Sequence, residues 1–187
     1  MGFPKPLLMV GDETFLRRTA SAMLQVARRV TIVTGAHADR IRAEVPSDAR
    51  ITIVNNADFT RGQLSSLKSG LAAVSSDASA AMVHLADHPL VLGSTYRAVA
   101  DEFAAKGASI VIPRHAGRRG HPVLFARTIF SELMAAPDDQ GARFVVNADP
   151  ARIVYVDVDD VGVTLDLDTP ADLVRAGLAP PPGVDGL

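Results

Sequence analysis

The chain of 187 residues contains 19 basic and 21 acidic residues, a formal charge of −2, and 48% hydrophobic side chains. This length and apolar content suit one domain with its own core, and charges spread along the chain exclude the basic stripe typical of nucleic-acid binding. Because there is no cysteine, disulfides, thiolate metal sites and cysteine nucleophiles are also excluded. Apolar runs are short and broken by charges, so neither a membrane span nor a signal peptide is predicted, and we expect a cytoplasmic protein that binds a small molecule.

The predicted elements alternate between strands and helices, which is the pattern of βαβ units. Apolar residues first recur at helical spacing between Glu13 and Arg28 and predict an amphipathic helix. Strands are predicted at Val30 to Thr34, Ile51 to Asn55, Ala81 to Leu85, Ser109 to Ile112, Val123 to Phe125 and Ile153 to Val158. Further helices are predicted at Leu64 to Val74, Thr95 to Ala105, Thr128 to Ala135, Ala142 to Asn147 and Ala171 to Ala176.

Two runs, Val83 to Leu85 and Ser109 to Ile112, are almost continuously apolar, as expected of central strands covered on both faces. We therefore expect an α/β fold: a three-layer, doubly wound, mostly parallel sheet. Residues 1–178 should form one domain. The proline- and glycine-rich segment 179–187 lacks periodicity and is expected to be a disordered tail.

One carboxylate follows a buried strand: Ala81-Met-Val-His-Leu-Ala-Asp87-His-Pro89. In open α/β sheets ligands bind beyond the carboxyl ends of strands, so Asp87 is a candidate to hold a metal or a substrate hydroxyl. Capping of the following turn is the alternative. His84 and His88 stand four residues apart, but on a strand that enters a turn their side chains diverge, so they do not predict a zinc site.

A second acidic motif is Asp166-Leu-Asp168-Thr-Pro170. On a strand, two carboxylates two residues apart point to the same face, and together with Asp87 they would suit Mg²⁺. The competing interpretation is an ordinary helix start, with Thr169 as the N-cap and Pro170 at the first helical position. We expect a metal role for at least one of these aspartates.

Two further motifs are candidates for anion binding. Gly62-Gln-Leu-Ser65-Ser66 opens a predicted helix, whose free N–H groups and hydroxyls could hold a phosphate or a nucleoside, although Ser65 could also be a routine cap. In Gly117-Arg-Arg119-Gly120-His121-Pro122, arginines could grip a phosphate and His121 could orient a ligand, although arginines in turns are commonly only solvated. In Asp139-Gln-Gly141-Ala-Arg143 a turn glycine comes before an arginine at the start of another predicted helix, although a plain loop is the alternative.

The order of these motifs resembles the MobA-like nucleotidyltransferases, and within them the MocA-type molybdenum-cofactor cytidylyltransferase branch. The resemblance covers about Phe3 to Leu178 and includes Lys5-Pro-Leu-Leu, Ala86-Asp87-x-Pro89 and Arg119-Gly-His-Pro122. It implies a reaction in which an acceptor phosphate attacks the α-phosphorus of a nucleoside triphosphate, CTP or GTP, and releases pyrophosphate with the help of Mg²⁺. The implied acceptor is a pterin phosphate.

The resemblance also implies roles for particular residues. Lys5 would contact the triphosphate and act with Asp87 in catalysis, and Asp87 with Asp166 or Asp168 would hold Mg²⁺. Nucleotide binding would involve Gly62, Ser65 and Ser66 beside Lys5, whereas Arg119, Gly120, His121 and Arg143 would face the acceptor.

The sequence departs from the family pattern at its start. Members normally open with a strand and a loop of the form L-A-A-G-x-S-x-R-M-G before K-P-L-L, whereas here Met1-Gly2 comes directly before that segment. The resemblance thus indicates a chain without the first strand and phosphate loop, either because an internal methionine is taken as the start or because this is a truncated paralogue. Neighbouring strands would be left with open edges, so we expect another segment or a second copy, in a homodimer, to pair there.

Three other interpretations remain open. A truncated paralogue could bind a nucleotide or a partner without turnover. A sugar or phospholactate nucleotidyltransferase would differ only in its acceptor. A glycosyltransferase of similar architecture is suggested by the D-x-D form of Asp166-Leu-Asp168, but that motif normally follows a central strand in mid-chain.

Overall fold

The computed structural model describes residues 3–180, so most of the expected tail lies outside the described residues. The strands are β1 Met9–Val10, β2 Glu13–Thr14, β3 Val30–Thr34, β4 Ile51–Asn55, β5 Ala80–Val83, β6 Ile110–His115, β7 Arg118–Arg119, β8 Val123–Ala126 and β9 Ile153–Asp157. The helices are α1 Phe15–Leu24, α2 Ala38–Glu44, α3 Gln63–Ala72, α4 Gly93–Lys106, α5 Phe130–Ala135, α6 Arg143–Ala148 and α7 Pro170–Arg175. Within residues 3–180, no helix is long and apolar enough to cross a membrane.

Most predicted elements are present, with shifted ends. The first helix is shorter than predicted because Glu13–Thr14 pairs with Met9–Val10 in a hairpin, and Thr14 then caps α1 by accepting a hydrogen bond from Arg17 N at 3.2 Å. The sequence interpretation did not include α2, whose seven residues are too few for a clear periodic signal.

The strands form a mixed arrangement rather than the expected mostly parallel sheet. β3 pairs with β4 in parallel and the two form a sheet of their own. A second sheet has the order β5-β8-β6-β7, with β9 parallel to β6. β8 runs antiparallel to both β5 and β6 because the chain reaches it through the tight β7 turn and not through a crossover helix.

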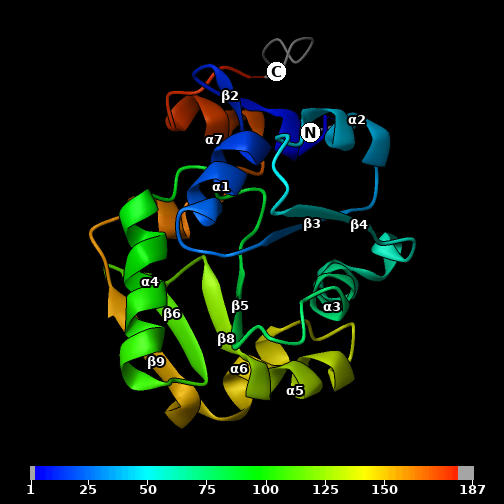
Figure 1. Cartoon of the computed structure of the whole chain (residues 1–187). Coiled ribbons are helices and arrows are strands. Elements are labelled where there is room, and N and C mark those ends of the chain that lie inside the picture. Colours follow the sequence, from blue (N-terminus) through cyan, green and yellow to red (C-terminus); the bar gives the residue numbers. More distant parts are fainter. Residues whose placement is uncertain (1–2, 181–187) are drawn as a thin grey trace.

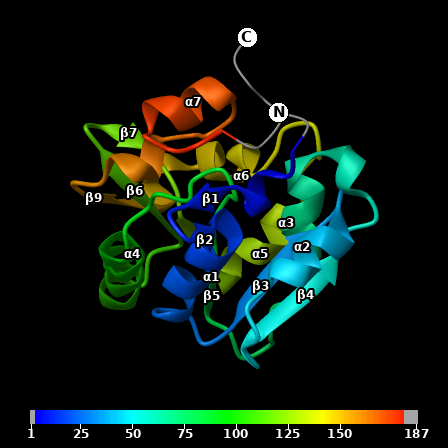
Figure 2. The same ribbon diagram turned by 90° about the horizontal axis from the view of Figure 1, so that it is seen from above.

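Helices nevertheless cover both faces of the larger sheet, as predicted for a three-layer α/β fold (Figures 1 and 2). On one face, Val99 of α4 packs against Val111 of β6 and Leu124 of β8. On the other face, α3, α5 and α6 contribute Leu71, Leu133 and Val145 to the main cluster of buried residues.

The two ends of the described chain pack together. Leu8 and Phe15 from the N-terminal part share a buried cluster with Leu167 and Leu173 from the C-terminal part. Figure 1 shows α7 beside the β1–β2 hairpin and α1, away from α5 and α6. This packing brings Lys5, in the short 3₁₀ turn Lys5–Leu7, next to residues far along the chain.

Leu133→Ala tests the main core. Leu133 is fully buried in α5, whereas the neighbouring Met134 is 44% exposed. We expect Leu133→Ala to lower the free energy of unfolding by about 2–5 kcal/mol, because it removes apolar contacts and leaves a cavity. Met134→Ala, the matched control, should change it by well under half as much. Urea denaturation measures both, and equal losses would contradict the assigned packing.

Candidate active site

Three predicted site residues meet where the N- and C-terminal segments approach the end of β5. The Lys5 ammonium lies 3.5 Å from Asp87 Oδ2 and is also hydrogen-bonded to Asp168 Oδ1. Lys5 and Asp168 are separated by 163 positions in the sequence. The structure therefore brings together the lysine and one aspartate from each acidic motif.

A backbone hydrogen bond joins the two acidic motifs. Leu167 N donates to Asp87 O at 3.0 Å, and the Leu167 side chain is fully buried between the exposed Asp166 and Asp168. The expectation that Asp166 and Asp168 lie on a strand is wrong, because this segment is an extended loop between the turn Val161–Thr164 and α7. The alternation around a buried leucine still turns both carboxylates outward.

The helix-start interpretation of the second motif is also confirmed, with the residues that it named. Thr169 and Asp172 form a capping box, in which each side chain accepts a hydrogen bond from the other's backbone N–H, and Pro170 occupies the first turn. The side chains of Asp166 and Asp168 are not part of this box. They contact Lys5 and His88 instead.

Charge compensation around Lys5 is strong. Burial by itself would lower the pKa of Lys5, but the hydrogen bond from Lys5 to Asp168 and the charges of Asp87 and Asp168 outweigh it, so the pKa of Lys5 is raised above its ordinary value. The ammonium is therefore charged at neutral pH. It can interact with an anionic group such as a phosphate.

The fit of a divalent cation depends on Asp87. Its Oδ1 is buried and has no hydrogen-bond partner among the described residues, as expected of an oxygen that awaits a cation or a donor. Within residues 3–180, however, no three His, Asp or Glu side chains form a group that could hold a metal ion. Mg²⁺ typically takes one or two carboxylates together with substrate phosphates, so these residues fit a cation that arrives with its substrate.

The start of α3 is organised by a residue that the sequence interpretation missed. Asn56, 4% exposed, donates from Nδ2 to Ser65 Oγ at 2.8 Å and to Ser66 Oγ at 3.1 Å. Ser65 Oγ in turn donates to the carbonyl of Gly62, which is the N-cap residue, so Ser65 is not the cap. The signal for Asn56 was its position directly after a predicted strand.

The Ser65 hydroxyl makes its hydrogen bonds within the protein, whereas Ser66 lines a cavity. The Ser65 hydroxyl is occupied by Asn56 and by backbone carbonyls. Ser66, but not Ser65, lines a cavity of about 1560 Å³. A ligand in that cavity would meet Ser66 first.

The glycine-rich turn packs tightly against the loop before α7. Gly120 N donates to Pro113 O, and His121 N donates to Val163 O, both at 2.9 Å. A Cβ on Gly120 would lie 2.1 Å from Val163 O, so no other residue fits there. Arg119 extends over the Tyr155 ring at 5.2 Å and donates to Asn147 Oδ1 at 3.3 Å.

Histidines connect this turn to the carboxylates. His88, which is 4% exposed, lies 2.6 Å from Asp166 Oδ1 through Nε2, and its ring is 4.9 Å from that of His121. The His84 ring lies 6.3 Å from that of His88 and beside Tyr96, and its Nε2 contacts His88 O at 3.0 Å.

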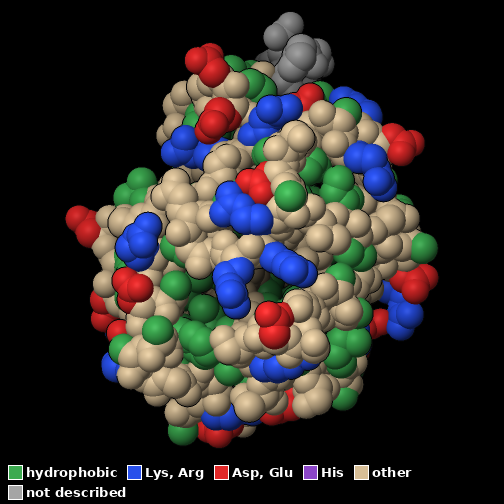
Figure 3. All heavy atoms as spheres, in the orientation of Figure 1, with side chains coloured by type: hydrophobic (Ala, Val, Ile, Leu, Met, Phe, Trp, Pro, Cys, Tyr) green, Lys and Arg blue, Asp and Glu red, His purple; other side chains and the backbone are tan. Residues whose placement is uncertain are grey.

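Most of the candidate residues line one large cavity of about 1560 Å³. The candidates among its lining residues are Ser66, Asp87, Arg119, Gly120, His121, Arg143 and Asp166. Lys5, Gly62, Ser65 and Asp168 are not among them, although Lys5 contacts Asp87. Charged Arg28, Arg29 and Asp77 also line the cavity, and Figure 3 shows charged side chains around a hollow with hydrophobic atoms inside it.

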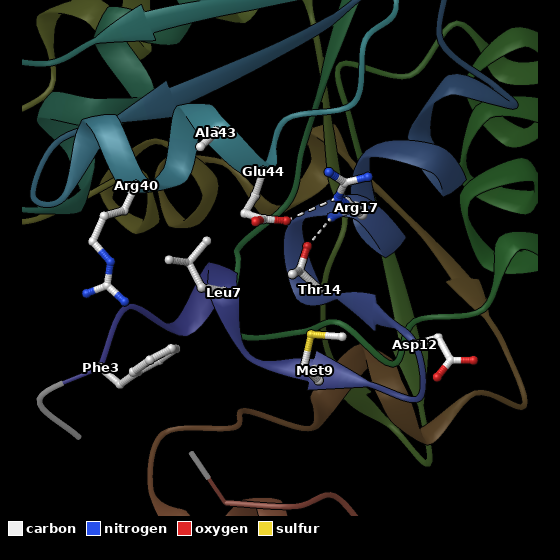
Figure 4. A pocket seen from close by; sticks show the side chains of 9 residues that line it. All are labelled: Phe3, Leu7, Met9, Asp12, Thr14, Arg17, Arg40, Ala43 and Glu44. Carbon is white, nitrogen blue, oxygen red and sulfur yellow. Dashed lines mark hydrogen bonds and ion pairs between the residues drawn. The ribbon is translucent and has the colours of Figure 1, made fainter. Parts of the chain in front are cut away.

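A second hollow of about 660 Å³ contains none of the candidates. It lies between the N-terminal hairpin and α2 (Figure 4), where Arg17 pairs with Glu44 at 3.3 Å and Arg40 lies over the Phe3 ring at 5.3 Å. The candidate site residues therefore lie in or beside the larger cavity and not in this second hollow.

Strand β5 lies at an edge of its sheet and pairs only with β8 among residues 3–180, so the expectation of a central strand there is wrong, whereas β6 is central as predicted. The lysine and two aspartates still lie beyond the carboxyl end of β5, where ligands bind in open α/β sheets. Residues 1–153 match the model of the MobA-like NTP transferase domain, and the chain belongs to this family.

Individual relatives agree with this assignment. The chain is 26% identical over 180 residues to a molybdenum cofactor cytidylyltransferase of Escherichia coli (strain K12), covering 94% of this chain and 88% of that protein. It resembles Rv0371c of Mycobacterium tuberculosis H37Rv with a TM-score of 0.77 and 30% identity, over 94% of this chain and 90% of that one. The manganese complex of Rv0371c matches with a TM-score of 0.73 at 30% identity, over 92% and 90% of the two chains.

Gly120→Ala tests the close approach of the glycine-rich turn. Because the added methyl group would overlap Val163 O, we expect a loss of about 1–3 kcal/mol in unfolding free energy. Gly93→Ala is the control, since the nearest heavy atom to its Cβ would be Gln25 Oε1 at 3.7 Å, an ordinary contact. Thermal denaturation compares the two, and an unchanged Gly120→Ala protein would contradict the packing.

The histidines predict a pH dependence of stability. Burial, and then the neighbouring His121 and His88, lower the pKa of His84 to about 3, and burial lowers the pKa of His121 to about 4. The unfolded chain binds protons on these rings near pH 6.5, so their stabilising contribution is complete above pH 6.5 and is lost as pH falls toward 4 and 3.

His84→Asn should therefore flatten the acid side of the stability curve, by an amount on the order of 3 kcal/mol between pH 6.5 and pH 3.5. Urea denaturation at several pH values measures the curve, and an NMR titration of the wild-type rings measures the midpoints directly. Parallel curves for the two proteins, or a His84 midpoint near 6.5, would contradict the assignment.

Proposed function

We propose that the protein transfers a nucleoside monophosphate, most directly CMP, from a nucleoside triphosphate to a phosphorylated acceptor of the molybdopterin type. The acceptor phosphate oxygen forms a bond to the α-phosphorus, the bond from the α-phosphorus to the bridging oxygen breaks, and pyrophosphate leaves. Family membership supports the nucleotidyltransferase class. The choice of CTP and of a pterin acceptor draws on the relative named a molybdenum cofactor cytidylyltransferase.

The observation that carries the proposal is the Lys5–Asp87–Asp168 cluster at the rim of the large cavity. A charged lysine beside two carboxylates can hold a triphosphate through the ammonium while the carboxylates bind its counter-cation. When a substrate arrives, Lys5 can exchange its aspartate partners for phosphate oxygens. The work of such a site is alignment and charge compensation, because the protein forms no covalent bond to the substrate.

Mg²⁺ would be held by Asp87 with Asp166 or Asp168, and it would supply charge neutralisation on the phosphates. The unpartnered Asp87 Oδ1 supports this role. A relative with 30% identity was crystallised with manganese, which is consistent with a divalent ion in this family.

The remaining candidates divide between the two substrates. Ser66, supported by Asn56 and Ser65, would contact the nucleoside at the start of α3, where Gly62 leaves backbone N–H groups free. Arg119, Gly120, His121 and Arg143 would face the acceptor. Among the described residues, Arg143 has no acidic partner within 4.0 Å and lines the same cavity as His121, so an anionic acceptor would supply the missing partner.

A non-catalytic nucleotide-binding protein is the second candidate. It is favoured by the pairing of Lys5 with Asp87 and Asp168, which neutralises the carboxylates, and by the lack of a ready-made three-ligand metal group among residues 3–180. Both candidate functions predict that the protein binds a nucleotide, but only the nucleotidyltransferase predicts turnover.

The test is Mg²⁺-dependent pyrophosphate release from CTP, GTP and ATP with molybdopterin as acceptor. We expect activity with one preferred nucleotide. Lys5→Ala and Asp87→Asn should each lower kcat/KM by about 10²–10³-fold, because each removes a charge that stabilises the transition state. Asp87→Asn should in addition raise the Mg²⁺ concentration needed for half-maximal rate.

Asp101→Asn and Lys106→Ala are matched controls on α4, far from the cluster in sequence and place. Both should retain wild-type rates. Calorimetric binding of CTP with no pyrophosphate release from the folded wild-type protein would establish the non-catalytic alternative and overturn the proposed activity.

A further inference from the structure

The loop of residues 136–142 joins α5 to α6 and is attached to α3 through Asp138. The Lys68 ammonium, on α3, lies 2.7 Å from Asp138 Oδ1 and also donates to Ala136 O at 2.7 Å. From the short 3₁₀ turn Phe59–Arg61 before α3, Arg61 Nη2 lies 2.7 Å from Asp138 Oδ2. Both oxygens of Asp138 are therefore paired, each with a cation from a different part of the chain.

The contact with Lys68 is partly sheltered from solvent. The side chains of Asp138 and Lys68 are 20% and 22% exposed, whereas that of Arg61 is 62% exposed. The hydrogen bond from Lys68 is the main cause that holds the pKa of Asp138 below its ordinary value, so the carboxylate is charged at neutral pH. Because a sheltered, charge-assisted hydrogen bond contributes more than a solvated surface pair, Lys68 is the stronger of the two attachments.

The backbone holds Asp138 in a defined place. Ala136, at the start of the loop, is 3% exposed and belongs to the main core together with Leu64 of α3. Gln140 N then donates to Pro137 O at 3.2 Å, which closes a turn that contains Asp138. The first half of the loop is therefore fixed both by apolar packing and by the ion pairs.

The second half of the loop leads directly to a candidate acceptor residue. Gly141, with φ of +65°, and Ala142 come just before Arg143, the first residue of α6. Ala142 O accepts hydrogen bonds from Val145 N and Val146 N, both at 3.1 Å, so the loop sets the first turn of α6. The place of Arg143 therefore depends on how the loop is held.

Asp138 thus connects segments that belong to the two proposed substrate sites. Arg61 directly precedes the N-cap residue of α3, and Lys68 follows Ser66 by two positions on that helix. Ser66 and Arg143 line the same cavity of about 1560 Å³. Because only four residues separate Asp138 from Arg143, the paired carboxylate restrains where the guanidinium can reach.

We propose that Asp138 is a positioning residue for acceptor binding: its ion pairs with Lys68 and Arg61 hold the loop so that Arg143 faces the acceptor phosphate. The identity of the acceptor rests on the proposed function. Without the Asp138 carboxylate the loop is freer, and ordering it again costs part of the binding energy of the acceptor. Nucleotide binding is not weakened, because the start of α3 keeps its own hydrogen bonds from Asn56.

Asp138→Asn tests the proposal, with Glu102→Gln as the matched control. Glu102 is also a carboxylate paired with a lysine, Lys106 on the same helix, and it does not line the cavity. In the pyrophosphate-release assay we expect Asp138→Asn to raise KM for molybdopterin about tenfold, while kcat and KM for the preferred nucleotide change by less than about twofold. Glu102→Gln should leave all three at wild-type values.

A second measurement does not require turnover. The Arg143 Nε–H signal is followed by NMR while inorganic phosphate is added. We expect phosphate to bind at Arg143 about fivefold to tenfold more weakly in Asp138→Asn than in the wild-type and Glu102→Gln proteins, with larger backbone motion at Gly141. Loss of a negative charge by itself would favour an anion, so weaker binding identifies positioning and not long-range electrostatics.

Lys68→Met removes the main attachment of the loop while keeping the length of the side chain. If Asp138 acts through Lys68, each single variant weakens phosphate binding and the double variant is no more than about twofold weaker than Asp138→Asn alone. Fully additive losses would overturn the proposal.

The two proposals fail in different ways. Unchanged or tighter phosphate binding in Asp138→Asn, together with an unchanged KM for molybdopterin, would overturn the positioning role and leave the nucleotidyl transfer intact. Absence of pyrophosphate release from every protein, together with the expected loss of phosphate affinity in Asp138→Asn, would overturn the proposed activity and support the positioning of Arg143 by Asp138.

Discussion

The hydrogen bond from Leu167 N to Asp87 O is the contact on which the candidate site depends. It attaches the C-terminal loop to the carboxyl end of β5, and the buried Leu167 side chain anchors that loop among Leu8, Phe15 and Leu173. As a result, Lys5 from one end of the chain and Asp168 from the other reach Asp87 together. A loosened Leu167 would separate all three.

The same segment supports the other side of the site. Val163, in the turn just before this loop, accepts the hydrogen bond from His121 and leaves room only for a glycine at position 120. His88 links Asp166 to this side, with its ring 4.9 Å from that of His121. Lys5 and the basic turn are therefore both positioned by one short stretch of chain, which makes their relative placement rigid.

The two-part sheet sets this domain apart from a simple doubly wound sheet. Residues of β3 and β5 line one cavity, and several candidate site residues lie at its rim beside apolar side chains. The pairing directions also follow from the connections: a tight turn at β7 makes β8 antiparallel, whereas β3–β4 and β6–β9 are joined through helices and are parallel.

The α/β class and the candidate site residues could both be predicted from sequence patterns. Periodicity identified all six long strands and most helices, and motif order identified the MobA-like family before any geometry was known. The side-chain contacts of the site depend on tertiary packing: Asp168 contacts Lys5, Asp166 contacts His88, and Ser65 is hydrogen-bonded to Asn56 and Gly62. Local patterns record which side chains are buried and which backbone turns are allowed, but contacts across 163 positions depend on how separate segments pack, and no local pattern contains that information.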